Sequence, residues 1–172
     1  NSSTKFSDYA VLYRSNFQSR VLEQAFRNYK IPYTISGGKS FFDKAEIKDI
    51  MAYLRLTINE DDDSAFIRAI TTPKRGIGET TLDKLSTYAA RREISLFEAL
   101  FEEGFAAVCN PVQLENVLDF GRFINDIQAR QKYEPAGELL TEILSAIKYE
   151  EYLYDSEELK EEEKRYGNVL SF

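Results

Sequence analysis

The sequence contains no histidine, no tryptophan and only one cysteine, Cys109. Without histidine, Ser-His-Asp catalysis, Cys-His catalysis and the usual zinc sites are excluded, so any chemistry would depend on carboxylates, lysine or tyrosine. A single cysteine excludes an internal disulfide framework. These absences argue against a hydrolytic enzyme in this chain alone, and we expect no metal site and no catalytic residue in it.

Long apolar runs are also missing. No stretch approaches the roughly 18 consecutive apolar residues of a membrane span, and neither a signal peptide nor a lipid-anchor motif is present. We therefore expect a cytoplasmic protein that does not bind membranes. Hydrophobic residues nevertheless make up 43% of the 172 positions, with 12 phenylalanines and 11 tyrosines. That content can fill the core of one ordinary domain, or of a domain plus part of another.

Charge is unevenly distributed along the chain. Residues 1–92 carry 15 lysines and arginines against 11 acidic residues, a net charge of +4, whereas residues 93–172 carry 7 against 18, a net charge of −11. The overall net charge of −7 is therefore a poor guide to binding partners, because a cationic face can coexist with an acidic half.

The first 36 residues predict a strand, a helix and a second strand. Residues 9–13, Tyr-Ala-Val-Leu-Tyr, form a short apolar run without helical period, and Ser15 with Gln18 has the form of a capping box. The helix should end near Tyr29, before a second short strand at residues 32–36. Two strands are too few for an independent sheet. We expect this β-α-β piece to belong to a larger α/β domain.

The pattern changes to a helical period after a possible hinge at Gly37 and Gly38. We expect helices to start near residues 44, 63–64, 80–81, 95, 111 and 135, from the capping residues and prolines at these positions. The final stretch, residues 159–172, has no helix-terminating signal, so the helical region should continue beyond it. The predicted fold is thus mainly α, with a β-α-β piece over residues 1–36 and a helical domain over residues 37–172.

Two motifs favour structural roles. "SGGKS", residues 36–40, resembles a phosphate-binding loop, but the G-x-x-x-x-G-K-[ST] pattern needs glycine where Tyr33 stands. "NEDDD", residues 59–63, lacks the spacing of a calcium loop, and carboxylates at a helix start are favoured by the helix dipole. We interpret the first as a hinge and the second as a helix start.

"YRSN", residues 13–16, leaves two interpretations open. It follows the first predicted strand, at the edge where open α/β sheets place ligands. Arg14 could hold a phosphate, and Asn16 could hydrogen-bond to a nucleic-acid backbone or base. Alternatively, an exposed arginine simply precedes the capping residue Ser15.

"TTPKRGIGETT", residues 71–81, is the most informative motif. Gly76 and Gly78 allow backbone N–H groups to face outward without obstruction by Cβ atoms. The helix expected from Thr80 or Thr81 adds free N–H groups and the positive end of its dipole, and the threonine hydroxyls can donate to a phosphate. Together these features predict an anion-binding turn that contacts nucleic-acid phosphates without reading bases.

Within this turn, Lys74 and Arg75 could attract a phosphate, and Ile77 could anchor the turn in the core. The same turn also has a second interpretation. The motif could instead be a helix C-cap followed at once by an N-cap, with the two cations drawn to the C-terminus of the preceding helix. Local sequence alone does not separate these two possibilities.

The order of segments resembles the UvrD, PcrA and Rep group of superfamily 1 DNA helicases. The similarity lies in "DYAVLYRSNFQSRVLEQAF", "EIKDIMAYLRL", "DDDSAFIRAITTPKRGIGETTLDKL" and "SLFEAL", and it extends over about residues 8–100. Near the end, "YEEYLYD" and "KRYGNVLSF" are most similar to the Rep branch. The resemblance implies that residues 1–36 belong to the motor domain 2A and residues 37–172 to a helical orthogonal bundle, the 2B subdomain, which regulates unwinding.

The resemblance also implies site residues. Arg14 and Asn16 match the 2A element that contacts single-stranded DNA. The residues that match elements contacting the duplex ahead of the junction are Lys48, Gly76, Ile77, Gly78 and Thr81.

The resemblance further implies a longer parent protein, an ATP-dependent 3′ to 5′ helicase of bacterial replication or repair that uses ATP and Mg²⁺. This chain lacks the ATPase motifs, so we expect no cofactor in it and no ATP hydrolysis by it alone. Expected partners are DNA, the rest of the helicase and accessory replication or repair proteins, in the cytoplasm at the nucleoid. Two alternatives remain: a helical protein-interaction module, and a stand-alone helix-hairpin-helix DNA-binding protein.

Overall fold

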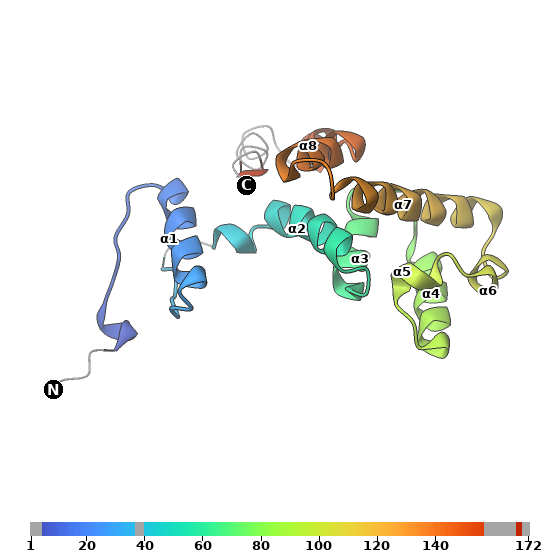
Figure 1. The fold of residues 1–172 in the computed structure, drawn as a ribbon, viewed down its shortest axis with the longest axis horizontal. Coiled ribbons are helices and arrows are strands. Elements are labelled where there is room, and N and C mark those ends of the chain that lie inside the picture. Colours follow the sequence, from blue (N-terminus) through green and yellow to red (C-terminus); the bar gives the residue numbers. More distant parts are fainter. Residues whose placement is uncertain (1–4, 37–39, 157–167, 170–172) are drawn as a thin grey trace. The chain divides into compact units, whose positions relative to one another are not determined.

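The computed structural model describes residues 5–36, 40–156 and 168–169, and all regular secondary structure within these ranges is helical (Figure 1). The chain divides into two compact units, residues 1–48 and 49–172. The division falls within α2 (Ala45–Ile58). The prediction of a mainly α fold is confirmed, whereas the predicted hinge residues Gly37 and Gly38 lie outside the described residues.

The first unit contains η1 (Phe6–Asp8), α1 (Asn16–Asn28), η2 (Phe41–Asp43) and the first residues of α2. The predicted capping box is present at the start of α1, where the side chain of Gln18 accepts a hydrogen bond of 3.3 Å from the backbone N–H of Ser15. The buried carboxylate of Glu23 accepts hydrogen bonds from the backbone N–H of Phe41, at 3.1 Å, and from the hydroxyls of Ser40 and Tyr33. This carboxylate fastens α1 to the segment that follows it.

The two predicted strands are not seen. Residues 9–13 and 32–35 have no regular secondary structure, and Leu12 is 95% exposed. A strand is defined by hydrogen bonds to a neighbouring strand, and the described residues supply neither segment with such a partner. Only the helical part of the predicted β-α-β piece is therefore observed.

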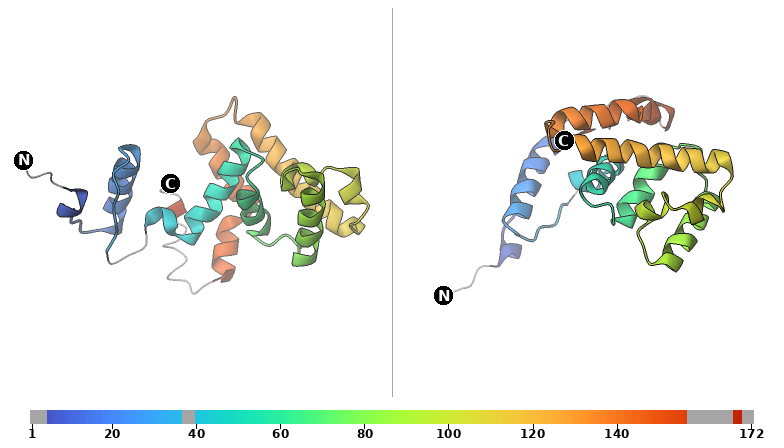
Figure 2. Two further views of the ribbon diagram at one scale, coloured as in Figure 1. Left: turned by 90° about the horizontal axis from the view of Figure 1, so that it is seen from below. Right: turned by 45° about the vertical axis from the view of Figure 1, so that its right-hand side comes forward.

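The second unit is built from the rest of α2 and from the helices that follow it, shown from further directions in Figure 2. These helices are α3 (Asp63–Thr71), α4 (Glu79–Arg92), α5 (Leu96–Ala99), α6 (Glu103–Ala106), α7 (Pro111–Arg130), α8 (Ala136–Ala146) and α9 (Tyr149–Ser156). At the centre of the main core, the ring of Phe66 packs edge-to-face on Phe120 and Phe97, with centroid distances of 5.7 and 6.3 Å. The core thus joins α3, α5 and α7.

Most of the predicted helix starts are close to those observed. Asn110 caps α7 with Pro111 at its first position, and Ser95 accepts a hydrogen bond from the N–H of Glu98 at the start of α5. The cap of α3 is Asp62, whose carboxylate accepts from the N–H of Ala65 at 3.0 Å. This contact confirms a helix-start role for the NEDDD segment.

Three details differ from the predictions. Helix α4 begins at Glu79 rather than at a threonine, because Gly78 acts as its N-cap. Pro135 is the N-cap of α8 instead of its first residue. The helices α6 and α9 were not predicted; α6 has only 4 residues, too few to establish a periodic pattern. No helix in the described ranges is long and apolar enough to cross a bilayer.

A buried carboxylate holds three helices of the second unit together. Asp49, 6% exposed, accepts hydrogen bonds from Arg68 of α3, with Nε at 2.8 Å, and from the hydroxyl of Tyr149 at 2.7 Å. Tyr149 is fully buried and begins α9, 100 residues away in sequence. The charge of Asp49 is therefore compensated by one cation and one neutral donor.

Removing the Tyr149 donor should destabilise the second unit. Tyr149→Phe leaves the Asp49 carboxylate with one hydrogen bond fewer, and a hydrogen bond to a charged group contributes about 1.5–3 kcal/mol. We expect the free energy of unfolding, from urea titration followed by circular dichroism, to fall by that amount. Tyr133→Phe is the matched control, because Tyr133 is 86% exposed. Equal stability of the two variants would contradict this role.

Candidate nucleic-acid interface

The predicted anion-binding turn is the connection between α3 and α4 in the second unit (Figure 1). We call residues 72–78 the hairpin. Its two cations point in different directions. Lys74 is exposed and has no hydrogen bond or ion pair among the described residues, whereas Arg75 is half-buried beneath the hairpin. Only Lys74 thus presents its charge to solvent.

Arg75 closes the C-terminus of α3. Its Nη1 donates to the carbonyl oxygens of Ala69, at 2.8 Å, and Pro73, at 3.0 Å. The last carbonyl groups of a helix have no partner within the helix, and a cation there also interacts favourably with the helix dipole. This part of the motif therefore matches the second interpretation of the sequence, in which a cation is drawn to the preceding helix.

Aromatic side chains fix the guanidinium of Arg75 from two sides. It lies 5.6 Å from the ring centroid of Tyr53 and 5.3 Å from that of Phe120. Its Nη2 donates to the hydroxyl of Tyr53, which in turn lies 2.9 Å from the carbonyl oxygen of Ala69 and 2.5 Å from that of Thr72. Burial raises the pKa of Tyr53 to about 12, although Arg75 opposes the shift. Tyr53 therefore stays protonated and remains a donor.

The two glycines of the hairpin differ in what the fold requires of them. Gly76 has φ +70°, and a Cβ there would lie 3.0 Å from Nδ2 of Asn116, a donor to its carbonyl oxygen. Gly78 has the ordinary angles φ −89° and ψ 170°, and a Cβ there would meet nothing within 4 Å. The chain's own structure thus requires glycine at Gly76 but not at Gly78.

The start of α4 presents free donors beside Gly78. The N–H groups of Thr81 and Leu82 donate to the carbonyl oxygen of Gly78, whereas those of Glu79 and Thr80 have no acceptor among the described residues. As N-cap, Gly78 contributes no side-chain oxygen to satisfy them. This end of α4 can therefore bind an anion through its backbone.

The remaining predicted contact residues of the TTPKRGIGETT motif divide between surface and core. Thr80 is exposed, and Ile77 packs against the main core as the sequence predicts. Thr81 is only 2% exposed, on the same side of α4 as the buried residues Leu85 and Ala89. The hydroxyl of Thr81 is thus directed to the interior and not to a ligand in solution.

The other predicted contact residues belong to the first unit, so they are described apart from the hairpin. Lys48 forms an ion pair of 3.3 Å with Asp43 and is 46% exposed. The backbone N–H of Arg14 donates to Gln18, and its side chain is exposed. Asn16 is the first residue of α1, but its side chain lies outside the described residues.

Two side chains that shape the hairpin were missed by the sequence analysis. Tyr53 contacts Arg75 from 22 positions away, and Asn116 contacts Gly76 from 40 positions away. Each lies on a helix whose apolar period gives no indication of a polar contact with a distant turn. Only the folded arrangement of α2 and α7 around the hairpin identifies them.

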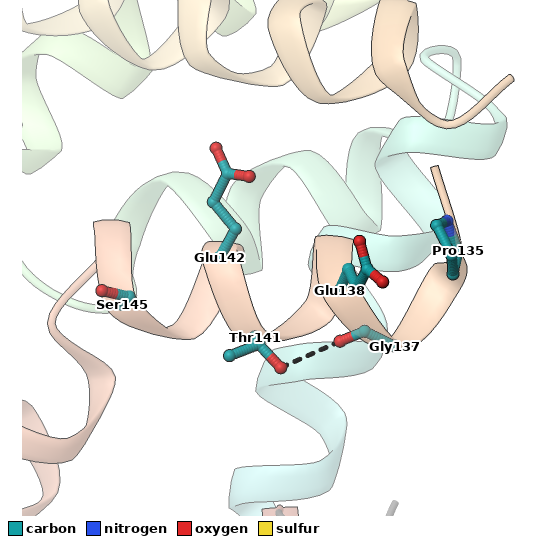
Figure 3. Close-up of a pocket in the computed structure, with 6 residues that line it drawn as sticks. All are labelled: Pro135, Gly137, Glu138, Thr141, Glu142 and Ser145. Carbon is teal, nitrogen blue, oxygen red and sulfur yellow. Dashed lines mark hydrogen bonds between the residues drawn. The ribbon is translucent and has the colours of Figure 1, made fainter. Parts of the chain in front are cut away.

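The second unit also has a hollow beside α8. Figure 3 shows its lining: Pro135, Gly137, Glu138, Thr141, Glu142 and Ser145. All six come from the start and one side of a single helix, and the Glu142 carboxylate is bound by Arg130. Two carboxylates and no lysine or arginine line the hollow, so it offers a phosphate no opposite charge. No group of three histidine, cysteine or acidic residues that could hold a metal ion occurs within the described residues.

Comparison with known proteins gives one family and several relatives. The model of the UvrD-like helicase C-terminal domain matches residues 1–108. The chain is 44% identical over 167 residues to the ATP-dependent DNA helicase Rep of Salmonella typhimurium, and the aligned region covers 96% of this chain and 25% of that relative. It is 40% identical over 171 residues to the ATP-dependent DNA helicase PcrA of Staphylococcus epidermidis, and here the aligned region covers 99% of this chain and 23% of the relative. The chain thus spans about a quarter of the length of these curated relatives.

The opposite orientations of Lys74 and Arg75 predict opposite effects on stability. Arg75→Gln removes charged hydrogen bonds to Ala69, Pro73 and Tyr53, so the free energy of unfolding should fall by about 2–3 kcal/mol. Lys74→Gln removes the same charge from an exposed side chain and should change it by less than about 0.5 kcal/mol. Urea titration measures both variants, and similar losses in the two would refute the inward role of Arg75.

The two glycines predict a second contrast. Gly76→Ala forces a side chain into a left-handed conformation and against Asn116, at a cost of about 1–2 kcal/mol. Gly78→Ala has ordinary angles and open space, so its effect should stay within about 0.5 kcal/mol. Thermal unfolding followed by circular dichroism tests the pair. A Gly78 variant as unstable as the Gly76 variant would show that the fold itself requires both glycines.

Proposed function

This chain belongs to the UvrD-like helicase C-terminal domain family, and from that premise we propose that it is part of an ATP-dependent 3′ to 5′ DNA helicase of the UvrD, PcrA and Rep type. Within such a protein, residues 1–36 belong to the motor domain 2A and residues 37–172 form most of the 2B subdomain. The similarity to Rep and PcrA along nearly the whole chain supports this role, and the closing segments favour the Rep branch.

The function proposed for the hairpin is to hold the phosphate backbone of duplex DNA next to the junction with single-stranded DNA. One observation carries this proposal: the fold of this chain does not require glycine at position 78, and Gly78 lies beside N–H groups that have no acceptor among the described residues. A close approach by another backbone is a common reason for glycine at such a position. The side chains of Lys74 and Thr80, in the same motif, are exposed.

The remaining hairpin residues give this contact surface its shape. Arg75 fixes the end of α3, Gly76 turns the chain, and Ile77 holds the turn on the core. The direct contacts proposed are therefore Lys74, the backbone at Gly78, and Thr80, while Thr81 supports the start of α4 from the interior. Phosphate contacts of this kind fix the position of a duplex without reading its sequence.

In the first unit, we propose Lys48 as a further duplex contact and Arg14 with Asn16 as contacts to single-stranded DNA. The exposed side chains of Lys48 and Arg14 support the proposal. ATP and Mg²⁺ are assigned to other parts of the longer helicase, because this chain lacks a phosphate-binding loop of the G-x-x-x-x-G-K-[ST] type. ATP hydrolysis is accordingly not proposed for this chain alone. A cytoplasmic location at the nucleoid and accessory replication or repair partners complete the proposal.

DNA binding can be tested with a tailed duplex by fluorescence anisotropy at several salt concentrations. Lys74→Glu should weaken binding about tenfold and lower the dependence of log Kd on log salt by about one, as for loss of one phosphate contact. Lys132→Glu reverses an exposed charge far from the hairpin in sequence and serves as the matched control. Binding that is unchanged in Lys74→Glu relative to wild type would reject the hairpin as the contact.

Gly78→Val provides an independent test that leaves charge unchanged. The valine side chain would obstruct the approach of a phosphate, although the backbone angles of Gly78 suit a β-branched residue and a Cβ there would meet nothing within 4 Å. We expect binding to weaken at least tenfold while the circular dichroism spectrum stays that of the wild type. Binding equal to wild type would favour the alternative, in which the motif is only a connection between helices.

A further inference from the structure

We propose that the DNA-binding surface continues from the hairpin along one face of α4, formed by Thr80, Lys84, Thr87 and Arg91. We call these four residues the α4 stripe. The inference rests on the proposed function of the hairpin and extends it, because the only member expected from the sequence is Thr80. The ligand it commits to is the sugar-phosphate backbone of duplex DNA.

The spacing places the four residues on a single line. They stand at positions i, i+4, i+7 and i+11 of a 14-residue helix, so they share one face. Over these positions the helix rises about 16 Å, at about 1.5 Å per residue, and phosphates along one DNA strand recur about every 3.4 Å of duplex. The stripe is therefore long enough to follow several phosphates beyond the one at the hairpin.

The charges of α4 are separated rather than paired. Lys84 and Arg91 have no carboxylate three or four residues away on the helix, while Glu79 and Asp83 lie together at one edge of the stripe, on the side of Thr80 and Thr87. Arg91 is exposed and has no ion pair among the described residues. This differs from α7, where Arg122 pairs with Asp119 at 2.5 Å and with Glu115 at 2.9 Å. A helix face that served only for solubility would mix the two signs.

Helix α7 shows that the stripe and the hairpin are neighbours. Gln113 of α7 accepts a hydrogen bond of 3.4 Å from Nζ of Lys84. Asn116, three residues further along the same face of α7, donates to the carbonyl oxygen of Gly76 at 3.5 Å. One short segment of α7 thus contacts both the stripe and the hairpin, so the two lie close together in the second unit.

Charge complementarity identifies the occupant. The stripe offers two cations and two hydroxyl groups and no apolar anchor, a combination that matches phosphates and carries no base-reading geometry. An acidic protein segment would carry the same sign of charge, but its interface would be expected to include buried apolar side chains. The continuity with the hairpin favours DNA.

The test is Lys84→Gln combined with Arg91→Gln in the 172-residue chain, compared with wild type in binding to the tailed duplex. Loss of two phosphate contacts should weaken binding at least tenfold and lower the salt dependence of log Kd by about two. Lys132→Gln with Lys148→Gln removes two exposed charges from outside the stripe and is the matched control. Circular dichroism verifies that both double variants remain folded.

The possible outcomes separate this inference from the function on which it rests. If Gly78→Val loses binding but the stripe variant binds as tightly as its control, the hairpin contact stands and the stripe is refuted. If wild type fails to bind the duplex, both proposals are overturned. If a polyglutamate peptide displaces the duplex as effectively as unlabelled duplex does, the stripe is a general anion surface and its assignment to DNA is refuted.

Discussion

The hairpin depends on the guanidinium of Arg75 at the C-terminus of α3. That group satisfies carbonyl oxygens that the helix leaves without partners, and it stacks on Tyr53 and Phe120 while doing so. The contacts join α2, α3 and α7 beneath a turn of seven residues. A lysine could supply the charge but not the planar fork that reaches two carbonyl oxygens and the Tyr53 hydroxyl. The rigid base leaves the outer side of the turn free for other contacts.

With Arg75 inward, the two interpretations of the motif turn out to describe different residues. Arg75 and Gly76 serve the fold, since one caps a helix and the other adopts φ +70°. Lys74 and Gly78 have no such duty, and both lie on the exposed side. A C-cap and a phosphate-binding turn are therefore compatible within one segment, because Arg75 is half-buried beneath the turn whereas Lys74 is exposed. Mutation can separate the two roles, because each can be tested by a contrast: Lys74 against Arg75, and Gly76 against Gly78.

The sequence predicted much of the helical part of the fold, because capping residues and prolines act locally. Ser15 and Asn110 mark their helices correctly. The two predicted strands are not observed, because a strand needs a hydrogen-bonded partner that local sequence cannot supply. In the site, Thr81 was predicted to contact the duplex, although its spacing from Leu85 and Ala89 puts it on the buried side of α4. Nothing local could have predicted the contacts of Tyr53 or Asn116 with the hairpin, which depend on how helices distant in sequence pack.

If the hairpin and the α4 stripe bind only phosphates, as proposed, this would determine how they act in a helicase. Each contact is electrostatic and independent of sequence, so a duplex that advances by one base pair meets an equivalent set of phosphates. The free energy of binding then changes little from one register to the next, and the surface can guide the duplex without stopping it. Residues 93–172, with a net charge of −11, would repel DNA and so limit attraction to the cations of the hairpin and the α4 stripe. Base-specific contacts would instead create preferred registers, at which an advancing duplex would pause.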